Sequence, residues 1–525
     1  MGFQKIQKIQ NEFLQKKRGK MDELFDFIKF ICQKLQIISD FIWDFPTNFI
    51  WYKNLPILGN FSLAIILLLG SGVYFTFRLK FVQIRYFKKS FEILKESKTT
   101  SFGISPLASF FLSTAMRVGS GNIIGVTGAI SVGGPGALFW MWASAFFGMA
   151  TAFCESTLTQ IFKEKHGNEY VGGISFYGKR LLWNSSIIGV CISLLYIIYA
   201  LLVLPSQGFN LISSLKEMAG IITGEQIPIN STFIVISSVI LIIAVLSISF
   251  GNIKKITRIT DILVPIMAVL YLGVVFILIL LNFDRVPYFF YAVFKGAFSP
   301  EAIFGGAFGV ALVQGIKRGL MSNEAGQGTL TMSAAVADAK HPCDQGLIQS
   351  MGVFLDTIVI CTFTGFVVVM ARLWESGGAS AWMAMDKLPK FIASGKELAP
   401  NAENFIALLF TFSFGLFVFT CVLAFISFSK ICAARISKSK LFINLITILC
   451  LFVMAFGIGA YITGLDLAAL WQLSDLANIL MVFANIPLLH IGFKYVKKSF
   501  DHYEKGGDSF DESVIGTKLE CWEKK

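Results

Sequence analysis

The chain is short of charged residues. Only 15% of its 525 residues are Asp, Glu, Lys or Arg, against about 25% in an ordinary soluble domain. The four histidines are scattered, and no His, Cys, Asp or Glu spacing is typical of a metal site. No nucleophile and base form a catalytic pattern. The longest polar stretch, 372–402, is too short for a soluble domain. These absences argue against a soluble enzyme.

The cysteines and the N-terminus lack the features of a secreted protein. The nine cysteines show no paired spacing, and several lie in apolar runs, such as Cys191, Cys361 and Cys450. We interpret them as buried free thiols. The basic N-terminus is not followed by a compact apolar run with a small-residue cleavage site, so no cleaved signal peptide is expected.

Long apolar runs are what the chain has instead. Hydrophobic residues make up 55% of the sequence, gathered in runs near the length of about 20 residues that crosses a bilayer. The length criterion gives about 11 spans, so the fold class is an all-α polytopic membrane protein. The spans are expected at 58–77, 105–131, 137–162, 186–214, 232–250, 260–283, 302–322, 347–371, 403–430, 440–463 and 470–493.

Basic residues set the expected orientation. The net charge of +12 comes from Lys and Arg between the apolar runs, which the positive-inside rule explains without nucleic acid. Alternate loops are basic and are expected in the cytoplasm with the C-terminus. They are 78–98, 163–180, 254–258, 317–340, 435–440 and the tail from 494. The loop 372–402 and the basic N-terminus run against this assignment.

Three regions are expected along the chain. Residues 1–57 form a basic segment in which 24–52 predict an amphipathic helix lying in the membrane interface, with a tilted span as the alternative. Residues 58–495 form the transmembrane domain, and 496–525 form a cytoplasmic tail.

Two of the spans contain stretches that disfavour a continuous helix. The first is Val118-Gly-Ser-Gly-Asn122, whose residues have low helix propensity. The second is Gly315-Ile-Lys-Arg-Gly-Leu-Met-Ser-Asn-Glu-Ala-Gly-Gln-Gly328. A helix break in a membrane persists only where it lines a polar cavity. Each stretch opens a group of five spans, which predicts a 5+5 inverted repeat with one extra N-terminal helix and a site at the bilayer midplane. A Gly-rich helix-packing face is the alternative.

Several polar residues inside the spans are candidates for that site. Ser120 and Asn122 either bind substrate or satisfy the broken backbone. Gln207 either binds a ligand or bridges two helices. Thr420, followed by Cys421, offers a hydroxyl to a hard cation or bonds back to its own helix.

Charged residues within the spans need partners or roles. Lys317, Arg318 and Glu324 are expected to cluster at the cytoplasmic end of their span, as a gate network with Arg117 or Glu155 or as snorkelling side chains. Asp356 lies ten residues into an apolar span, so we expect a buried partner or a role in proton transfer.

The motifs resemble the alanine or glycine:cation symporter family over about 58–495. The resemblance is carried by four segments: Ala115-Met-Arg-Val-Gly-Ser-Gly-Asn-Ile-Ile-Gly-Val126, Gly133-Gly-Pro-Gly-Ala-Leu-Phe-Trp-Met-Trp142 with Gly148-Met-Ala-Thr151, Lys317-Arg-Gly-Leu-Met-Ser-Asn-Glu-Ala-Gly-Gln-Gly328, and Gly352-Val-Phe-Leu-Asp-Thr-Ile-Val-Ile-Cys-Thr362. It implies the leucine-transporter type of fold in a bacterial inner membrane, with a small neutral amino acid and Na⁺ as ligands, no cofactor and a monomer.

The resemblance also assigns roles. The substrate contacts would be Gly119, Ser120, Gly121, Asn122, Gln207, Phe304 and Phe308. The Na⁺ site would use carbonyls near Ala115 and Val118, with side chains at Thr420 and Cys421. Cys421 stands where the family usually has a second hydroxyl, and a thiol is a poor ligand for a hard cation.

The expected function is therefore Na⁺-driven import of alanine or glycine, in the L or D form, by alternating access. A proton-coupled transporter of the same fold is one alternative, with Asp356 as the proton carrier. A membrane channel is the alternative of another class, but it would need an open pore lined by polar rings.

Overall fold

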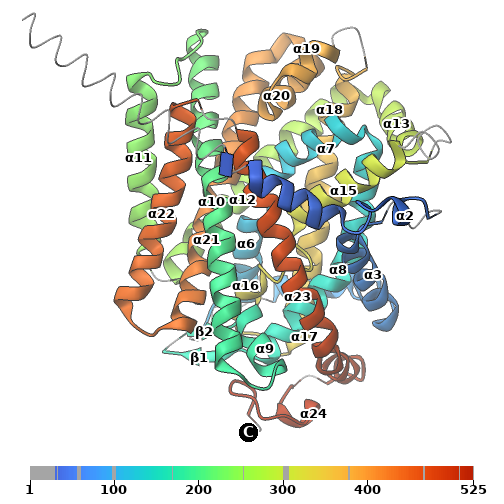
Figure 1. The fold of residues 1–525 in the computed structure, drawn as a ribbon, viewed down its shortest axis with the longest axis vertical. Coiled ribbons are helices and arrows are strands. Elements are labelled where there is room, and N and C mark those ends of the chain that lie inside the picture. Colours follow the sequence, from blue (N-terminus) through green and yellow to red (C-terminus); the bar gives the residue numbers. More distant parts are fainter. Residues whose placement is uncertain are drawn as a thin grey trace, which may run out of the picture.

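The computed structural model describes most of the chain as helix. The described residues are 30–31, 33–55, 59, 61–96, 102–167, 169–251, 253–298, 307–375, 379–464, 467–507 and 509–523. Within them, eight helices are long and apolar enough to cross a membrane. Most run side by side along the long axis of the molecule (Figure 1), as in a polytopic membrane protein. The expected number of about 11 spans remains a prediction.

The long helices account for most of the bundle. They are α8 (Gly136–Ile161), α10 (Ser186–Thr223), α11 (Thr232–Ser249), α12 (Ile253–Leu281), α21 (Glu403–Ile436), α22 (Lys440–Ile462) and α23 (Leu467–Glu504), together with α17 (Pro342–Val353), the π-helix η4 (Phe354–Cys361) and α18 (Thr362–Ala371), which follow one another without a gap.

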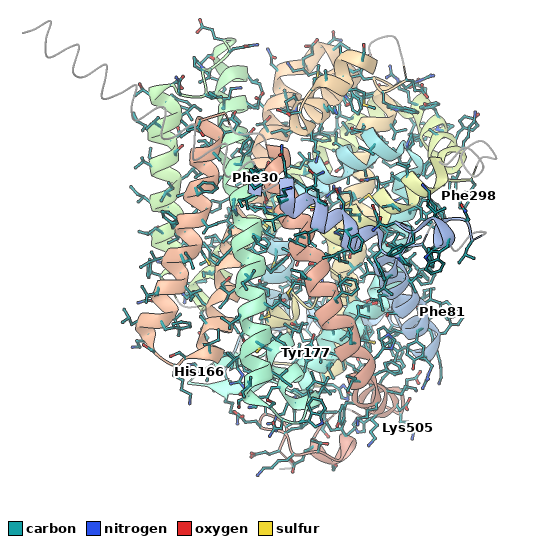
Figure 2. The ribbon with its side chains drawn as sticks, in the orientation of Figure 1. Phe30, Phe81, His166, Tyr177, Phe298 and Lys505 are labelled. Atoms are coloured by element: carbon teal, nitrogen blue, oxygen red, sulfur yellow. The ribbon has the colours of Figure 1, made fainter. Side chains whose placement is uncertain are left out.

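Shorter elements lie at the two ends and along one side of the bundle (Figure 1). We call the end that carries the C-terminus the C-terminal face, and the other end the opposite face (Figure 1). The shorter elements are α2 (Ile50–Lys53), α3 (Leu63–Arg78), α4 (Val82–Arg85), α5 (Phe87–Lys95), β1 (Glu164–His166), β2 (Glu169–Val171), α9 (Ile174–Leu181), η3 (Phe283–Arg285), α13 (Val286–Phe298), α19 (Ala379–Ala384), α20 (Lys387–Leu398), η5 (Pro400–Ala402) and α24 (Glu512–Ile515). His166 and Lys505 mark the C-terminal face in Figure 2.

Both predicted interruptions are present. The first lies between α6 (Pro106–Arg117) and the π-helix η2 (Gly121–Gly125), which continues into α7 (Val126–Gly133). The second separates α15 (Ala307–Asn323) from α16 (Thr331–Ala335). Its backbone turns at Gly326 and Gly328, whose φ angles of 92° and 73° favour glycine. The sequence therefore predicted both breaks correctly.

The second broken helix is longer than the expected span 302–322. It continues through the break to α16, so Lys317 and Arg318 lie within α15 rather than at a cytoplasmic helix end. The expected end at 322 is close to the end of α15 at Asn323, but the expected span left out the segment beyond the break. Of the expected basic loop 317–340, only the residues that follow α16 form a loop at the end of this segment.

The two terminal regions also differ in detail from expectation. Residues 33–44 are largely helical and cross in front of the bundle (Figure 1). Phe41 on this helix is exposed while Trp43 is buried, a one-sided pattern that suits an interfacial helix. Residues 1–29 lie outside the described part. At the other end, α23 continues to Glu504, beyond the expected boundary at 495.

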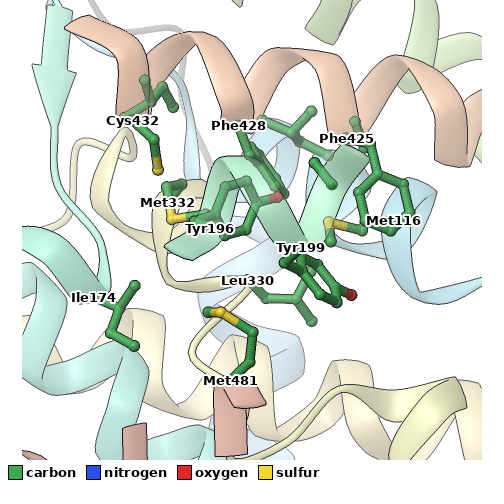
Figure 3. Close-up of a cluster of buried hydrophobic side chains, with 14 of the residues drawn as sticks. Met116, Ile174, Tyr196, Tyr199, Leu330, Met332, Phe425, Phe428, Cys432 and Met481 are labelled. Carbon is green, nitrogen blue, oxygen red and sulfur yellow. The ribbon is translucent and has the colours of Figure 1, made fainter. Parts of the chain in front are cut away.

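An apolar cluster fills the space between the breaks and the C-terminal face. Figure 3 shows side chains from both broken helices meeting those of the long helices α10 and α21. Met116 comes from α6, and Met332 comes from α16. Other members are Tyr196, Tyr199, Leu330, Phe425, Phe428, Cys432 and Met481. The cluster closes the interior on this side.

Candidate functional site

Two π-helical turns face each other at the centre of the site. Asn122 lies on η2 at the first break, and Asp356 lies on η4. Asn122 Nδ2 donates to Asp356 Oδ1 over 2.6 Å, while Asn122 Oδ1 accepts from the Gly119 amide at 3.0 Å. π-helical turns are uncommon and occur often at functional sites. Asn122 thus both closes the first break and holds the acid.

Asp356 also binds the second broken helix. Its Oδ2 accepts a hydrogen bond from the Ser322 hydroxyl on α15 and another from the Thr357 hydroxyl, both at 2.7 Å. The carboxylate is 1% exposed. We call Asn122, Ser322, Asp356 and Thr357 the polar joint, because it links the first broken helix, the second broken helix and η4. Asp356 has the buried partners that its position in an apolar span requires.

Ser120 and Gln207 form a second contact at the first break. The Ser120 hydroxyl donates to Gln207 Oε1 at 3.1 Å, and both side chains are buried. Gln207 follows Pro205 within α10. This helix approaches α22 so closely that a Cβ on Gly457 would lie 1.9 Å from the Pro205 carbonyl oxygen. Gln207 is therefore held beside the break by a tightly packed helix pair.

The helix α21 brings Cys421 to the first break. Cys421 Sγ lies 3.4 Å from the Met116 carbonyl oxygen, and a Cβ on Gly119 would lie 3.1 Å from the same sulfur. Thr420 Oγ1 instead bonds to the carbonyls of Leu416 and Phe417, each at 3.1 Å. In this conformation the thiol faces the break and the hydroxyl bonds back to its own helix.

Of the remaining residues expected at the site, some lie beside the first break and others lie outside the described residues. Ala115 and Val118 are fully buried beside the break, where their carbonyls belong to the end of α6. Gly121 packs against α15, since its Cβ position lies 3.4 Å from the Met321 carbonyl oxygen. Phe304 and the side chain of Phe308 lie outside the described residues.

The expected single gate network is instead divided between two places. Near the breaks, Arg117 donates to the Asn323 carbonyl at 3.2 Å and to Gln349 Oε1 at 2.9 Å. Glu324 accepts from the Thr329 hydroxyl at 2.5 Å. Glu155 Oε2 accepts from the Gly328 amide at 3.2 Å. Among the described residues no ion pair joins Arg117 to either acid, so these groups stabilise the backbone around the second break.

Lys317 and Arg318 form the other half of the divided network, toward the opposite face. Both pair with Asp475 on α23, with N–O distances of 2.9 Å. The Trp43 indole donates to the Asp475 carbonyl oxygen at 3.0 Å. The Lys387 ammonium lies 4.4 Å from the Trp471 ring centroid. We call Lys317, Arg318, Lys387, Trp471 and Asp475 the outer cluster. It joins α15, α20 and α23.

The outer cluster places several cations around one carboxylate. The pKa of Lys387 on α20 is lowered to about 8, mainly by burial and then by the neighbouring charge of Arg318, while Asp475 opposes the shift. Lys390 and Lys317 also lower it. Asp475 is thus the acid that compensates this group of cations.

Sequence reasoning missed several polar residues that the site uses. They are Ser322, Asn323, Gln349, Asp475 and Asn485. Asn485 Nδ2 donates to Glu155 Oε2 at 2.9 Å. An acid or amide within an apolar span was the available signal, because such residues need partners. The identity of the partners depends on tertiary packing between distant segments.

Comparison with known proteins identifies the family. The family model described as the sodium:alanine symporter family matches residues 45–514. A probable sodium/glutamine symporter, GlnT of Bacillus subtilis, is 34% identical over 93% of this chain and 97% of its own. The sodium/alanine symporter AgcS of Methanococcus maripaludis is 31% identical over 80% and 90%.

A solved structure supports the fold. MhsT in complex with L-phenylalanine matches with a TM-score of 0.52 at 15% identity, over 78% of this chain and 90% of that one. This likeness supports the leucine-transporter type of fold that the family resemblance implied. The chain belongs to the sodium:alanine symporter family and is a transporter rather than an enzyme.

Proposed function

We propose that this protein imports a small neutral amino acid, alanine or glycine in the L or D form, together with Na⁺ by alternating access. The observation that carries the proposal is the polar joint, in which a buried carboxylate links both broken helices. Its geometry allows the two helices to move together when ligands bind. The names of the relatives support Na⁺ as the coupling ion and alanine as a substrate.

Within the described residues, side-chain contacts close both sides of the joint, as in an occluded carrier. The outer cluster ties α15 to α23 on one side, and the apolar cluster of Figure 3 fills the other. We assign the C-terminal face to the cytoplasm because basic residues such as Lys179, Lys254 and Lys438 gather in the loops expected there. A closed interior favours a carrier over a channel.

Transport by purified protein in proteoliposomes tests the proposal. Labelled L-alanine, D-alanine, glycine and glutamine are offered with and without an inward Na⁺ gradient, and with a protonophore. We expect Na⁺-dependent accumulation of alanine or glycine. Counterflow of labelled alanine, without an ion gradient, identifies a carrier, because a channel does not couple the efflux of unlabelled substrate to the influx of label. Accumulation that ignores Na⁺ and collapses with the protonophore would support the proton-coupled alternative.

The coupling-ion site leads to a prediction about Cys421. We expect Cys421→Ser to lower the Na⁺ concentration for half-maximal uptake about three- to tenfold, since a hydroxyl is a better ligand than a thiol for a hard cation. Thr420→Ala is expected to raise it or remove the Na⁺ response. A Na⁺ titration of uptake measures both. Cys432→Ser, on the same helix but away from the break, is the matched control. Equal Na⁺ responses in all four proteins would contradict this site.

The outer cluster leads to a prediction about Asp475. Breaking a buried ion pair by removing one partner costs about 3–5 kcal/mol, and Asp475→Asn leaves Lys317 and Arg318 unpaired. We expect uptake to fall at least about tenfold and the melting temperature in detergent to drop. Adding Lys317→Gln to Asp475→Asn removes the excess cation and is expected to restore part of both. An Asp475→Asn protein that transports and melts like wild type would show that the cluster does not close the protein.

A further inference from the structure

A short backbone bridge ties the two broken helices together at the C-terminal face. The Ile104 amide, just before α6, donates to the Val336 carbonyl at 3.1 Å, and the Asp338 amide donates back to the Ile104 carbonyl at 2.8 Å. Ile104 and Ala337 are thus paired in parallel. We call residues 102–105 and 336–338 the helix bridge. Both broken helices have to separate here for the interior to open to this face.

Gln160 on α8 and Lys163, just after this helix, hold the helix bridge in place. Gln160 Nε2 donates to the carbonyls of Ala334 and Ala337, the latter at 3.0 Å. Lys163 Nζ donates to the same Ala337 carbonyl at 2.9 Å and lies 3.8 Å from the Tyr170 ring centroid. The β1–β2 hairpin therefore reinforces a contact that spans both broken helices.

Gly103 of the helix bridge shows how closely the β1–β2 hairpin packs against the bridge. Gly103 has a φ angle of 72°, and a Cβ there would lie 2.7 Å from both the Tyr170 ring and the Val336 carbonyl oxygen. Phe102 packs edge-on against Tyr170, with ring centroids 4.6 Å apart. The bridge and the hairpin thus form one packed unit.

The C-terminal segment 509–523 covers this unit from outside. The Trp522 indole donates to the Gln160 carbonyl oxygen at 2.8 Å, and its ring lies 5.0 Å from Lys163 Nζ. Glu520 Oε1 accepts from the Lys165 amide on β1 at 2.8 Å. Trp522 therefore contacts both Gln160 and Lys163, the two residues that hold the helix bridge.

The segment is anchored to the bundle by a small core of its own. Phe510, Ile515 and Leu519 are buried, and the Ile515 carbonyl accepts from Lys498 Nζ on α23 at 3.1 Å. Phe510 stacks edge-on against Trp522, with ring centroids 5.2 Å apart. The segment is thus a folded element fixed to α23 rather than a trailing tail.

We propose that residues 509–523 are a latch that stabilises the closed state of the C-terminal face by holding Gln160 and Lys163 against the helix bridge. The inference rests on the proposed function, since a transporter has to open this face in its cycle. When the latch is released, the contacts of Gln160 and Lys163 with Ala337 weaken together, and the broken helices separate more often. The latch acts on the closed state and does not touch the polar joint.

Hydrogen–deuterium exchange of the full-length protein in proteoliposomes tests the latch. Exchange of backbone amides reports local opening. In Trp522→Ala, we expect the peptides that contain Ile104 and Asp338 to exchange about tenfold faster, because a hydrogen bond and an aromatic contact are lost. In Trp522→Phe, which keeps the ring but removes the donor, we expect an increase of about two- to fivefold.

The matched control is Glu523→Ala, next to Trp522 but exposed. Its exchange at the helix bridge is expected to equal wild type, and peptides of the outer cluster are expected to be unchanged in all variants. Unchanged exchange at Ile104 and Asp338 in a folded Trp522→Ala protein would overturn the latch. If that variant does not fold, the same result in Trp522→Phe overturns it. The exchange measurement needs neither substrate nor ion. Failure of the latch can therefore be told apart from failure of the proposed function, which the transport assays test.

Discussion

Asp356→Asn is expected to reduce both net uptake and counterflow of labelled alanine about a hundredfold. The carboxylate accepts hydrogen bonds from Asn122, Ser322 and Thr357. Each hydrogen bond to a charged group contributes about 1.5–3 kcal/mol, against about 1 kcal/mol for a neutral one. An asparagine removes the charge and turns one acceptor into a donor, so the link between the two broken helices weakens. Transport assays in proteoliposomes measure both activities.

The comparison of uptake with counterflow separates two roles for Asp356. If it joins the helices, both activities fall together. If it only carries the coupling proton, counterflow survives because exchange needs no net proton movement, and this result would contradict the joint. Ser350→Ala is the matched control. Ser350 is buried on the same long helix, and its hydroxyl has no hydrogen-bond partner among the described residues. We expect this variant to transport like wild type.

The sequence predicted the two breaks because their signal is local. Glycines beside Ser120 and Asn122, and again at Gly326 and Gly328, disfavour a helix whatever surrounds them. The same holds for Asp356, since an acid in an apolar run requires buried partners wherever they come from. These features could be found from spacing and residue type alone.

The pairing of charged residues could not be predicted in the same way. Lys317 and Arg318 interrupt an apolar run, which in sequence is indistinguishable from the basic end of a span. Their partner Asp475 lies on α23, more than 150 positions later. The pairing follows from how α15 and α23 pack, and no local pattern contains that information. The network expected near Glu324 is therefore divided between the breaks and the outer cluster.

The role of Asn122 is a further difference between the pattern and the structure. Because Asn122 begins the half-helix after the break, the sequence suggested that its side-chain amide binds the substrate carboxylate. In the closed protein both ends of the amide are already used, by Gly119 and Asp356. A direct contact with substrate remains a proposal, and it requires that one of these bonds be exchanged during the cycle.

Asn122→Ala is accordingly expected to reduce uptake about a hundredfold or more. The substitution leaves one buried Asp356 oxygen without the donor that Asn122 supplies, which costs about 1–3 kcal/mol or more for a charged group. It also removes one of the two acceptors of the Gly119 amide, which keeps its bond to the Arg117 carbonyl at 2.9 Å. Initial rates of labelled alanine uptake, normalised to protein inserted in the membrane, measure the effect. Asn122→Asp is expected to be at least as inactive, because its carboxylate would repel that of Asp356.

A control within the same half-helix shows whether the effect belongs to the joint. The Thr127 hydroxyl bonds back to the Ile123 carbonyl at 2.7 Å, so Thr127→Ala removes a buried polar group without touching either break. We expect its uptake to stay within about threefold of wild type, since such a bond contributes only about 1 kcal/mol. If Asn122→Ala and Thr127→Ala reduced uptake equally, the loss would reflect the packing of α7. If Asn122→Ala transported within a factor of about two of wild type, the amide would be dispensable, and Asp356 would hold the second broken helix through Ser322 alone.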